Sequence, residues 1–240
     1  MIGVLVLLAL LLTPALARTR VVDQAFQCRN NLRQLLHGWR MFADENSDNL
    51  PNCFGWVQGW LSYNTNNTDN TNLNYLVRGQ LGPYVKNPLI YKCPADQSQA
   101  IEGAVKLPRV RTLSMSQAFA PSGEGYISTA YRQYVKCADM VARSPANLWV
   151  MICESPGGVN DGAFAVVMTP HGGKWQDGPS ILHDGGCGFA FADGHYEMKK
   201  RTDSRTLRLN VTYTSPFPHG ITQTNNLDIQ WVQDRTTAPK

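Results

Sequence analysis

Ile2-Gly-Val-Leu-Val-Leu-Leu-Ala-Leu-Leu-Leu-Thr-Pro-Ala-Leu-Ala17 is apolar almost throughout and carries no charge. Its sixteen residues would form a helix about 24 Å long, shorter than the roughly 30 Å hydrocarbon core of a bilayer. A signal peptide would fit this length, and Ala15-Leu16-Ala17 resembles a cleavage site, but only Met1 precedes the run where a basic segment should stand. The positive charges, Arg18 and Arg20, follow it instead. We therefore expect further sequence upstream of Met1 that completes a membrane helix.

The apolar run continues into an amphipathic segment that ends at the polar cluster of residues 44–49. Its apolar residues recur at steps of three and four, which is typical of a helix with one buried face. They are Val22, Ala25, Phe26, Leu32, Leu35, Leu36, Trp39, Phe42 and Ala43, whereas the opposite face carries Arg29, Arg33, Gln34 and Arg40. The pattern predicts one helix of about 45 residues, with its first third in lipid and the remainder on a globular domain.

After residue 50 the patterns become typical of strands and turns. Residues 148–153 and 163–168 are continuous apolar runs of strand length. Residues 187–192 and 195–199 flank Asp193-Gly194, a strong hairpin signal, because a type I′ turn needs positive φ at both central residues. We therefore predict an α+β fold in which the long N-terminal helix packs on an antiparallel β-sheet.

The predicted organisation has three parts. Residues 1–17 form the membrane-anchoring helix segment, residues 18–49 continue the helix, and residues 50–240 form a globular α+β domain outside the cytoplasm. Within this domain the Asn/Thr-rich residues 62–74 are expected to form a surface loop, and residues 75–85 a short helix.

Composition excludes several classes of protein. With 43% hydrophobic and 17% charged residues, the chain is neither disordered throughout nor a multi-span membrane protein. Its net charge of +4 is spread along the sequence, so there is no basic stripe for nucleic acid. Nucleophile-elbow, zinc-protease, phosphate-loop and dinucleotide-binding motifs do not stand in a supporting context, so we expect no enzymatic activity.

Four ordered segments carry a family resemblance. They are residues 2–17 with their proline; Cys28-Arg-Asn-Asn-Leu-Arg-Gln-Leu35, followed by Met41-Phe-Ala-Asp-Glu-Asn46 and Leu50-Pro51; Tyr91-Lys-Cys-Pro-Ala-Asp96; and His183-Asp-Gly-Gly-Cys-Gly-Phe-Ala-Phe-Ala-Asp-Gly194. Together they resemble pilin-like proteins with a prepilin-type cleavage and methylation N-terminus. Such proteins abound in planctomycete and verrucomicrobial bacteria, where many are described as type II secretion pseudopilins. The last segment matches their C-terminal H-x9-DG element through His183, Asp193 and Gly194.

The resemblance implies a structural subunit, single-pass in the bacterial inner membrane, with its globular domain in the periplasm or outside the cell. In this family the apolar helices of neighbouring subunits pack together in the core of a filament or secretion pseudopilus. The resemblance therefore implies other pilin-like subunits and the membrane as partners, and no small-molecule substrate. The family's processing site, a Gly followed by Phe-Thr-Leu and a Glu, is absent here and is expected upstream of Met1.

Metal binding is a weaker alternative. His183, Cys187 and His195 could be drawn as a zinc site, but they lack the paired C-x2-C spacing typical of structural zinc. The simpler interpretation places Asp193-Gly194 in a hairpin turn and lets His183 bond to nearby backbone. Asp161, Asp193 and Glu154 are calcium candidates, without EF-hand spacing.

The six cysteines pose a separate question. Cys28 and Cys93 each lie in a family-like segment, and a disulfide between them would fasten the loop region to the helix, although both could equally be small buried side chains. Cys137, Cys153 and Cys187 lie in or near apolar segments and are expected to be buried free thiols. The pattern leaves Cys53 undetermined.

A second function stays open at this point. The chain could be a secreted or periplasmic domain, released after Ala17, that binds carbohydrate through Phe54, Trp56 and Trp60. Tryptophans in a globular domain more often belong to the core. We therefore expect the pilin-like structural subunit to be the better hypothesis.

Overall fold

The computed structural model describes residues 2–169, 172–209, 213 and 215–240, with side chains from Thr19 onward. The helices are α1 (Ile2–Glu45), α2 (Asn74–Val77), α3 (Ser204–Leu207) and α4 (Leu227–Gln233), with 3-10 helices η1 (Thr68–Asn70), η2 (Pro88–Tyr91), η3 (Cys137–Asp139) and η4 (Pro145–Asn147). The strands are β1 (Gln99–Glu102), β2 (Val105–Pro108), β3 (Leu113–Ser116), β4 (Trp149–Cys153), β5 (Ala163–Phe164), β6 (Gly172–Trp175), β7 (Gly186–Phe191), β8 (Tyr196–Lys200) and β9 (Ile221–Thr224). The predicted α+β class, with an N-terminal helix and antiparallel sheets, is confirmed.

The main sheet has five strands in the order β5-β3-β4-β7-β8. Strands β3, β4, β7 and β8 pair antiparallel, while the two-residue β5 runs parallel to β3. Two small antiparallel sheets, β1-β2 and β6-β9, lie beside it. Strands β3, β4 and β7 are buried along their whole length, which explains why residues 148–153 form a continuous apolar run rather than an alternating one.

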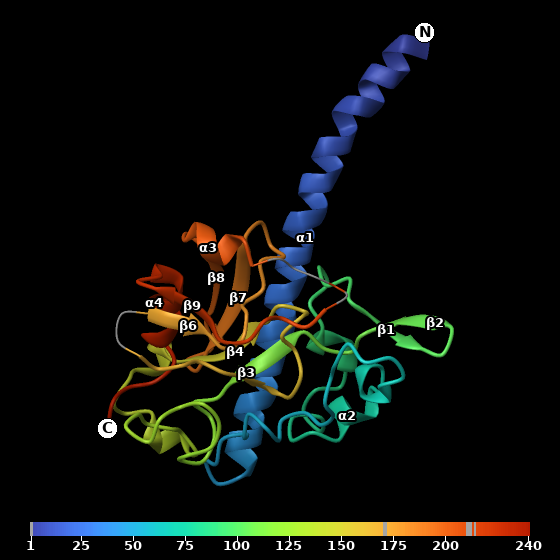
Figure 1. Cartoon of the computed structure of the whole chain (residues 1–240). Helices are drawn as coiled ribbons and strands as arrows, with labels where there is room; N and C mark the ends of the chain where they lie inside the picture. Colours follow the sequence, from blue (N-terminus) through green and yellow to red (C-terminus); the bar gives the residue numbers. More distant parts are fainter. Residues whose placement is uncertain (1, 170–171, 210–212, 214) are drawn as a thin grey trace.

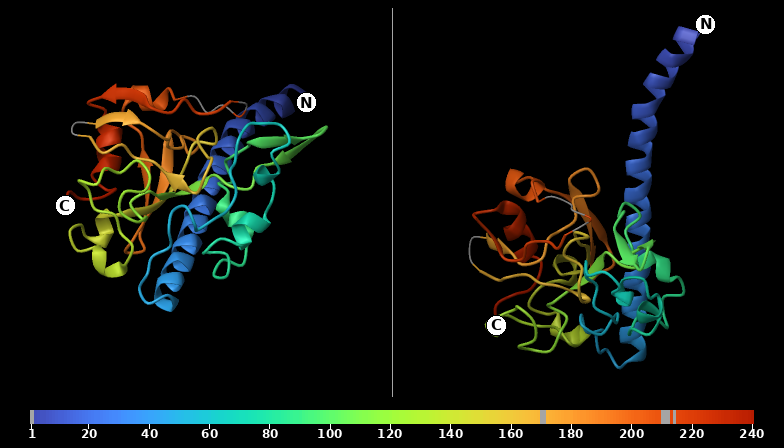
Figure 2. Two further views of the ribbon diagram at one scale, coloured as in Figure 1. Left: turned by 60° about the horizontal axis from the view of Figure 1, so that its bottom comes forward. Right: turned by 45° about the vertical axis from the view of Figure 1, so that its right-hand side comes forward.

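Helix α1 runs along one side of the globular domain, and its N-terminal part projects well beyond that domain (Figures 1 and 2). Leu32, Leu35 and Trp39 are buried in the core. Leu32 lies so close to β7 that a Cβ on Gly188 would meet its Cδ1 at 2.8 Å. In the part of the chain whose side chains are described, no helix combines the length and the apolar character needed to cross a membrane.

The burial of α1 agrees only in part with the predicted apolar stripe. Leu36 and Ala43 are also buried and Phe42 is half-buried, whereas Arg33 and Arg40 lie on the exposed face as expected. Val22 is 63% exposed and Phe26 58% exposed, so their assignment to the buried stripe was wrong. Among the residues whose side chains are described, Cys28 is the first buried residue of α1. Phe26 lies seven residues before Arg33 and shares its exposed face.

Two further expectations need correction. Of residues 163–168 only Ala163–Phe164 forms a strand, and Val166 makes an isolated bridge to Trp175 instead. Of residues 75–85 only the first three belong to a helix, because α2 ends at Val77 and turns follow.

The hairpin of β7 and β8 is confirmed, but its turn is not type I′. Among the three loop residues only Gly194 has positive φ, at 105°. The Gly194 N–H donates to the Phe191 carbonyl at 2.9 Å, and the Phe191 N–H donates to the His195 carbonyl at 3.0 Å. This is a three-residue loop built on a type I turn, in which glycine supplies the positive φ at the last position. Asp193 accepts a hydrogen bond from the His195 N–H at 3.0 Å.

We expect Gly194→Val to lower the free energy of unfolding by more than about 1 kcal/mol, because a β-branched residue resists positive φ. A Cβ at this position would meet no atom closer than 3.7 Å, so the loss would report backbone strain rather than a clash. Urea unfolding measures the difference. Asp193→Asn is the control and should be nearly neutral, since the amide oxygen can still accept from His195. A fully stable Gly194→Val variant would contradict this turn assignment.

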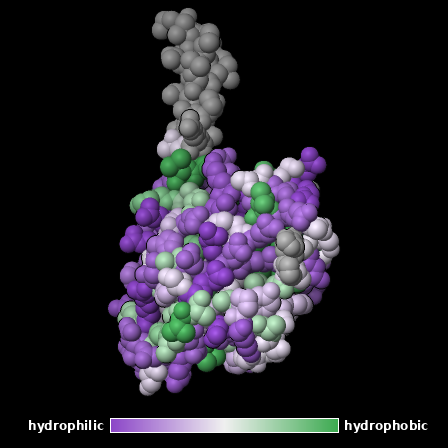
Figure 3. Space-filling view, turned by 90° about the vertical axis from the view of Figure 1, so that its left-hand side faces the viewer, coloured by the Kyte–Doolittle hydropathy of each residue, from purple (hydrophilic) through white to green (hydrophobic). Residues whose placement is uncertain are grey.

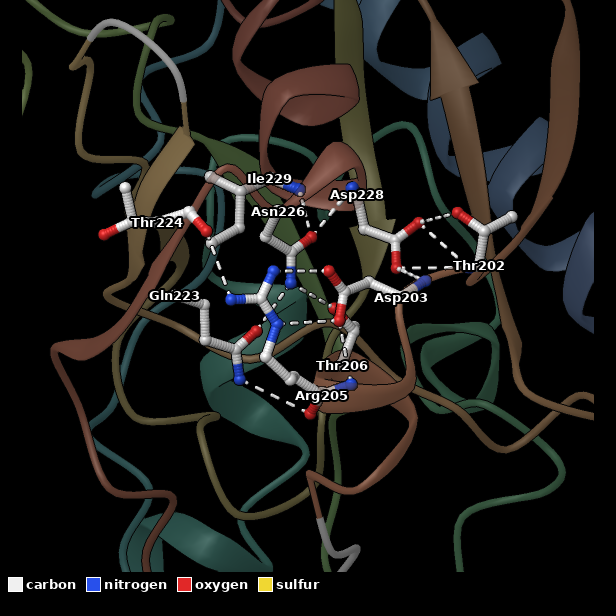
Figure 4. Close-up of polar contacts among 9 residues, drawn as sticks. All are labelled: Thr202, Asp203, Arg205, Thr206, Gln223, Thr224, Asn226, Asp228 and Ile229. Atoms are coloured by element: carbon white, nitrogen blue, oxygen red, sulfur yellow. Dashed lines mark hydrogen bonds and ion pairs between the residues drawn. The ribbon is translucent and has the colours of Figure 1, made fainter.

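Side-chain hydrogen bonds fasten the C-terminal elements together (Figure 4). Asn226 caps α4 by accepting from the N–H groups of Asp228 and Ile229, at 2.8 and 3.1 Å. The Asp228 carboxylate accepts from the backbone N–H groups of Thr202 and Asp203, so it connects α4 to the segment before α3. The buried polar side chains here are thus paired, as buried polar groups require.

Candidate metal centre

Four side chains of metal-ligand type converge between α1 and the main sheet. Cys28 comes from α1, Cys93 follows η2, Cys153 ends β4, and His183 precedes β7. Their ligand atoms all lie within 4.8 Å of one another, and all four residues are buried. Within the described residues this is the one group of three or more His, Cys, Asp or Glu side chains with such geometry.

Local structure places each of these residues. Cys28 lies one turn before Leu32 on the buried face of α1. Two α1 side chains hold the segment around Cys93 against the helix: Asn31 donates to the Lys92 carbonyl and Gln24 to the Pro94 carbonyl, each at 3.1 Å. The Cys93 N–H donates to Thr112 Oγ1 at 2.8 Å, which fastens the same segment to the residue before β3.

The other two residues are set by the sheet and by a turn. Cys153 pairs with Leu113 in the β3–β4 register. His183 and Gly186 exchange backbone hydrogen bonds around Asp184 and Gly185, whose φ values are 52° and 75°. Positive φ at both central residues is the type I′ pattern, so the type I′ Asp-Gly turn lies at 184–185 and not at 193–194. This tight turn directs the His183 side chain toward the cysteines.

The electrostatics of the cluster centre on Cys93. Its Sγ lies 3.2 Å from His183 Nε2. Hydrogen bonds from the Cys153 and Cys28 thiols lower the pKa of Cys93 well below its usual range, and His183 lowers it further. Hydrogen bonds to Cys28 and Cys93, together with burial, raise the pKa of Cys153. The arrangement therefore favours ionisation of Cys93 over that of the other two cysteines, with the imidazole nitrogen of His183 beside its sulfur.

Most sequence-predicted ligand sets are not assembled. His183 belongs to the cluster, but His195 is exposed and its Nδ1 contacts Asp193 Oδ1 at 2.7 Å. Cys187 lies near the cluster without joining it, because its Sγ accepts from Arg201 Nη2 at 2.7 Å. The expectation that His183 bonds to nearby backbone was wrong for the side chain, whose partner is Cys93.

The calcium candidates are also separate. Asp193 is exposed at the β7–β8 turn, whereas Glu154 is buried at the end of β4. Asp161 accepts from the Ala163 N–H at 2.7 Å and is half-buried. These three residues do not form a group of converging oxygen ligands within the described chain.

Cys28 and Cys93, the predicted disulfide pair, do meet in the structure, but as free thiols. Cys153 and Cys187 are buried free thiols, as expected. Cys53 is also a buried free thiol, whereas Cys137, which was expected to be buried, is only half-buried. The role of Cys153 was not predicted from the sequence. Three of the four cluster residues lie in the motif segments quoted above, which is a signal that could have prompted a search for a shared site.

The aromatic residues suggested for carbohydrate binding do not form one surface. Trp56 is fully buried and stacks on Tyr91 with ring centroids 5.6 Å apart, and its Nε1 donates to the Gly162 carbonyl at 2.7 Å. Phe54 and Trp60 remain exposed. The central residue of the suggested platform therefore belongs to the core.

Glu154 is a second buried polar group, and it directly follows β4. One oxygen of Glu154 accepts from Ser114 Oγ, and the other has no hydrogen-bond partner within the described residues. Burial raises the pKa of Glu154 well above its usual range, and the nearby carboxyl of Asp177 adds to the shift. The folded state therefore favours the neutral carboxyl.

The raised pKa predicts how stability depends on pH. The contribution of Glu154 is fully present below its unfolded pKa of about 4.3 and is lost as pH rises through its higher folded pKa. Raising the pH from about 5 to about 8 should therefore lower the free energy of unfolding of the unsubstituted protein. We expect the same change in pH to lower it less in the Glu154→Gln variant, whose side chain does not ionise. Thermal unfolding at both pH values measures this, with the exposed Glu124→Gln as control. Equal pH dependence in both variants would contradict the prediction.

Comparison with known proteins adds no relative. No protein-family model, no curated protein and no solved structure matches this chain.

Proposed function

We propose that the chain is a pilin-like structural subunit, anchored in the bacterial inner membrane by α1, that assembles with other pilin-like subunits into a filament or secretion pseudopilus. The observation that carries the proposal is the form of α1. α1 is one continuous helix of 44 residues. Its C-terminal half packs in the globular domain, and its N-terminal half extends away from that domain.

The side chains at the junction support this division of the helix. From Cys28 onward α1 contributes buried residues to the core, whereas Val22 and Phe26, just before it, are exposed. Hydrophobic side chains are visible where the helix leaves the globular body (Figure 3). Exposed apolar groups on a projecting helix lower their free energy when lipid or neighbouring helices cover them, by about 25 cal/mol per Å². The apolar sequence 2–17 continues the same helix outward.

Membrane fractionation with mass spectrometry tests the anchor. We expect the chain in the membrane fraction with residues 2–17 retained, because a pilin-like helix is not removed at an A-x-A site. A soluble protein whose N-terminus is Arg18 would contradict the proposal and favour the released binding domain.

Cross-linking between copies tests assembly. A photo-reactive amino acid in place of Phe26 should cross-link to a second copy or to another pilin-like subunit in the membrane. The same amino acid in place of Arg33, which is exposed on the part of α1 that packs on the domain, is the control and should give much less product. Equal yields at the two positions would contradict assembly through the projecting helix.

A further inference from the structure

We propose that Cys28, Cys93, Cys153 and His183 bind one structural Zn²⁺ ion, which joins α1 to the main sheet. This inference goes beyond the proposed function and does not depend on it.

The donor set matches zinc chemistry. Three cysteine sulfurs and one histidine nitrogen form one of the common sets of structural zinc sites, which are closed and tetrahedral. Soft thiolate ligands also suit Cu(I) and iron–sulfur clusters, but four protein ligands around a single point satisfy zinc without further partners. No position is left for water or substrate, so the ion would have a structural rather than a catalytic role.

The distances fit one ion. With Zn–S of about 2.3 Å and Zn–N of about 2.0 Å, an ideal tetrahedron separates two sulfurs by about 3.8 Å and a sulfur from a nitrogen by about 3.5 Å. Here the Cys93 Sγ to His183 Nε2 distance is 3.2 Å, and no pair of ligand atoms is further apart than 4.8 Å. Side-chain adjustments of about 1 Å would bring the four atoms into coordination.

Chance packing of small buried thiols explains this arrangement less well. The chain has six cysteines and five histidines, and three of the cysteines meet one of the histidines at a single point. The other two fully buried cysteines have different surroundings: Cys187 contacts Arg201, while Cys53 lies elsewhere in the core with its N–H donating to the Phe119 carbonyl.

Binding has a defined proton balance. In the loaded centre all three sulfurs would be thiolates, and the thiol protons still present before binding would leave to solvent. Zn²⁺ would also take the lone pair of neutral His183 Nε2, so that Nδ1 carries the ring proton. The loaded centre has one net negative charge. Arg201 is buried against the neighbouring Cys187 and supplies a positive charge on that side. A surface cavity of about 670 Å³ is lined in part by Gln27, Asn31 and Cys93, so it lies beside one of the four ligands.

The consequence for the fold is a cross-link at the point where α1 begins to contribute to the core. The ligands come from α1, the η2 segment, β4 and the turn before β7, and are far apart in the sequence. A zinc ion would thus do what the predicted Cys28–Cys93 disulfide would do, but with four attachments. Removing it should loosen the docking of α1.

Metal analysis of the purified full chain, prepared without chelator, tests the proposal. We expect one zinc per chain by mass spectrometry, and tetrahedral cobalt–thiolate absorption after exchange with CoCl2. Cys93→Ser and His183→Ala should each reduce the zinc content by at least about tenfold. Cys53→Ser is the matched control, because Cys53 is equally buried but lies outside the cluster, and it should keep its zinc.

Three further measurements keep the test decisive if a cluster variant fails to fold. His183→Cys should retain zinc in a four-cysteine site. In the unsubstituted chain, 1,10-phenanthroline should lower the melting temperature and added ZnCl2 should restore it. Six free thiols should be counted after denaturation with a chelator. A metal-free chain with six thiols, a chain with a disulfide within the cluster, or bound iron with sulfide would each overturn the proposal.

Discussion

Trp39→Ala is expected to lower the free energy of unfolding by about 3–5 kcal/mol, enough to unfold a marginally stable domain. Trp39 is only 2% exposed, and its ring packs edge-on against Phe119 with centroids 5.5 Å apart. Phe119 in turn contacts Tyr134 at 5.8 Å, so the indole of α1 is one member of a packed aromatic group. Truncation removes its contacts and leaves a cavity at the interface between helix and domain. Urea unfolding followed by circular dichroism measures the loss.

Two substitutions on the other face of α1 calibrate this result. Arg33 is exposed, so Arg33→Ala should cost less than about 0.5 kcal/mol. Arg40 is also exposed, but its Nη2 donates to the Ala192 carbonyl at 2.7 Å, so Arg40→Ala should cost about 0.5–1.5 kcal/mol. Equal losses for Trp39→Ala and Arg33→Ala would contradict the packing of α1 described here.

Arg111→Met is the second substitution with a large expected effect, again about 3–5 kcal/mol. The Arg111 side chain is fully buried, and its guanidinium donates to three backbone carbonyls: those of Leu113 at 3.1 Å, Asn160 at 3.3 Å and Asp161. Burial lowers the pKa of Arg111 to about 10, so it remains charged at neutral pH. Methionine keeps most of the volume but removes this donor from the Leu113 and Asp161 carbonyls, at about 1–3 kcal/mol for each buried group left unpaired. The Asn160 carbonyl still accepts from the Leu61 N–H.

The neighbouring carboxyl provides an internal test of this prediction. The positive charge of Arg111 opposes the rise in the pKa of Glu154, so each side chain affects the ionisation of the other. We therefore expect the double variant Arg111→Met, Glu154→Gln to lose less stability than the sum of the two single variants. Arg78→Met, at an exposed position, is the control for a buried-site effect and should be nearly neutral. Full additivity in the double variant would contradict the coupling.

Local patterns predicted those parts of the fold that depend on neighbouring residues in the chain. The steps of three and four from Leu32 to Ala43 predicted a helix and its buried face, because helical geometry places such residues on one side. The continuous apolar run at 148–153 predicted a buried strand, and Asp193-Gly194 predicted the β7–β8 hairpin. Each of these features is determined within about one or two turns of chain.

The burial of the upper helix could not be predicted in this way. Val22 and Phe26 recur at steps of three and four, but both are exposed. Phe26 lies seven residues before Arg33 and therefore shares its exposed face, although the domain still contacts α1 at Gln24. Steps of three and four alone do not show where the buried face ends, and the width of the surface that packs on the helix decides it. The type of the turn at Asp193-Gly194 could not be predicted for a similar reason. Both Asp-Gly pairs can adopt positive φ, and strand pairing decided that only 184–185 has it at both residues.

The sequence by itself determined that this chain has a long helix, an antiparallel sheet and six cysteines without paired spacing. Only the tertiary structure decided that Cys28, Cys93, Cys153 and His183 share one site. Each segment contributes a single ligand, so no local spacing marks the group. Their meeting depends on the rotation of α1 about its axis, on the β3–β4 register and on the turn at 184–185, and these long-range contacts are set when the core packs.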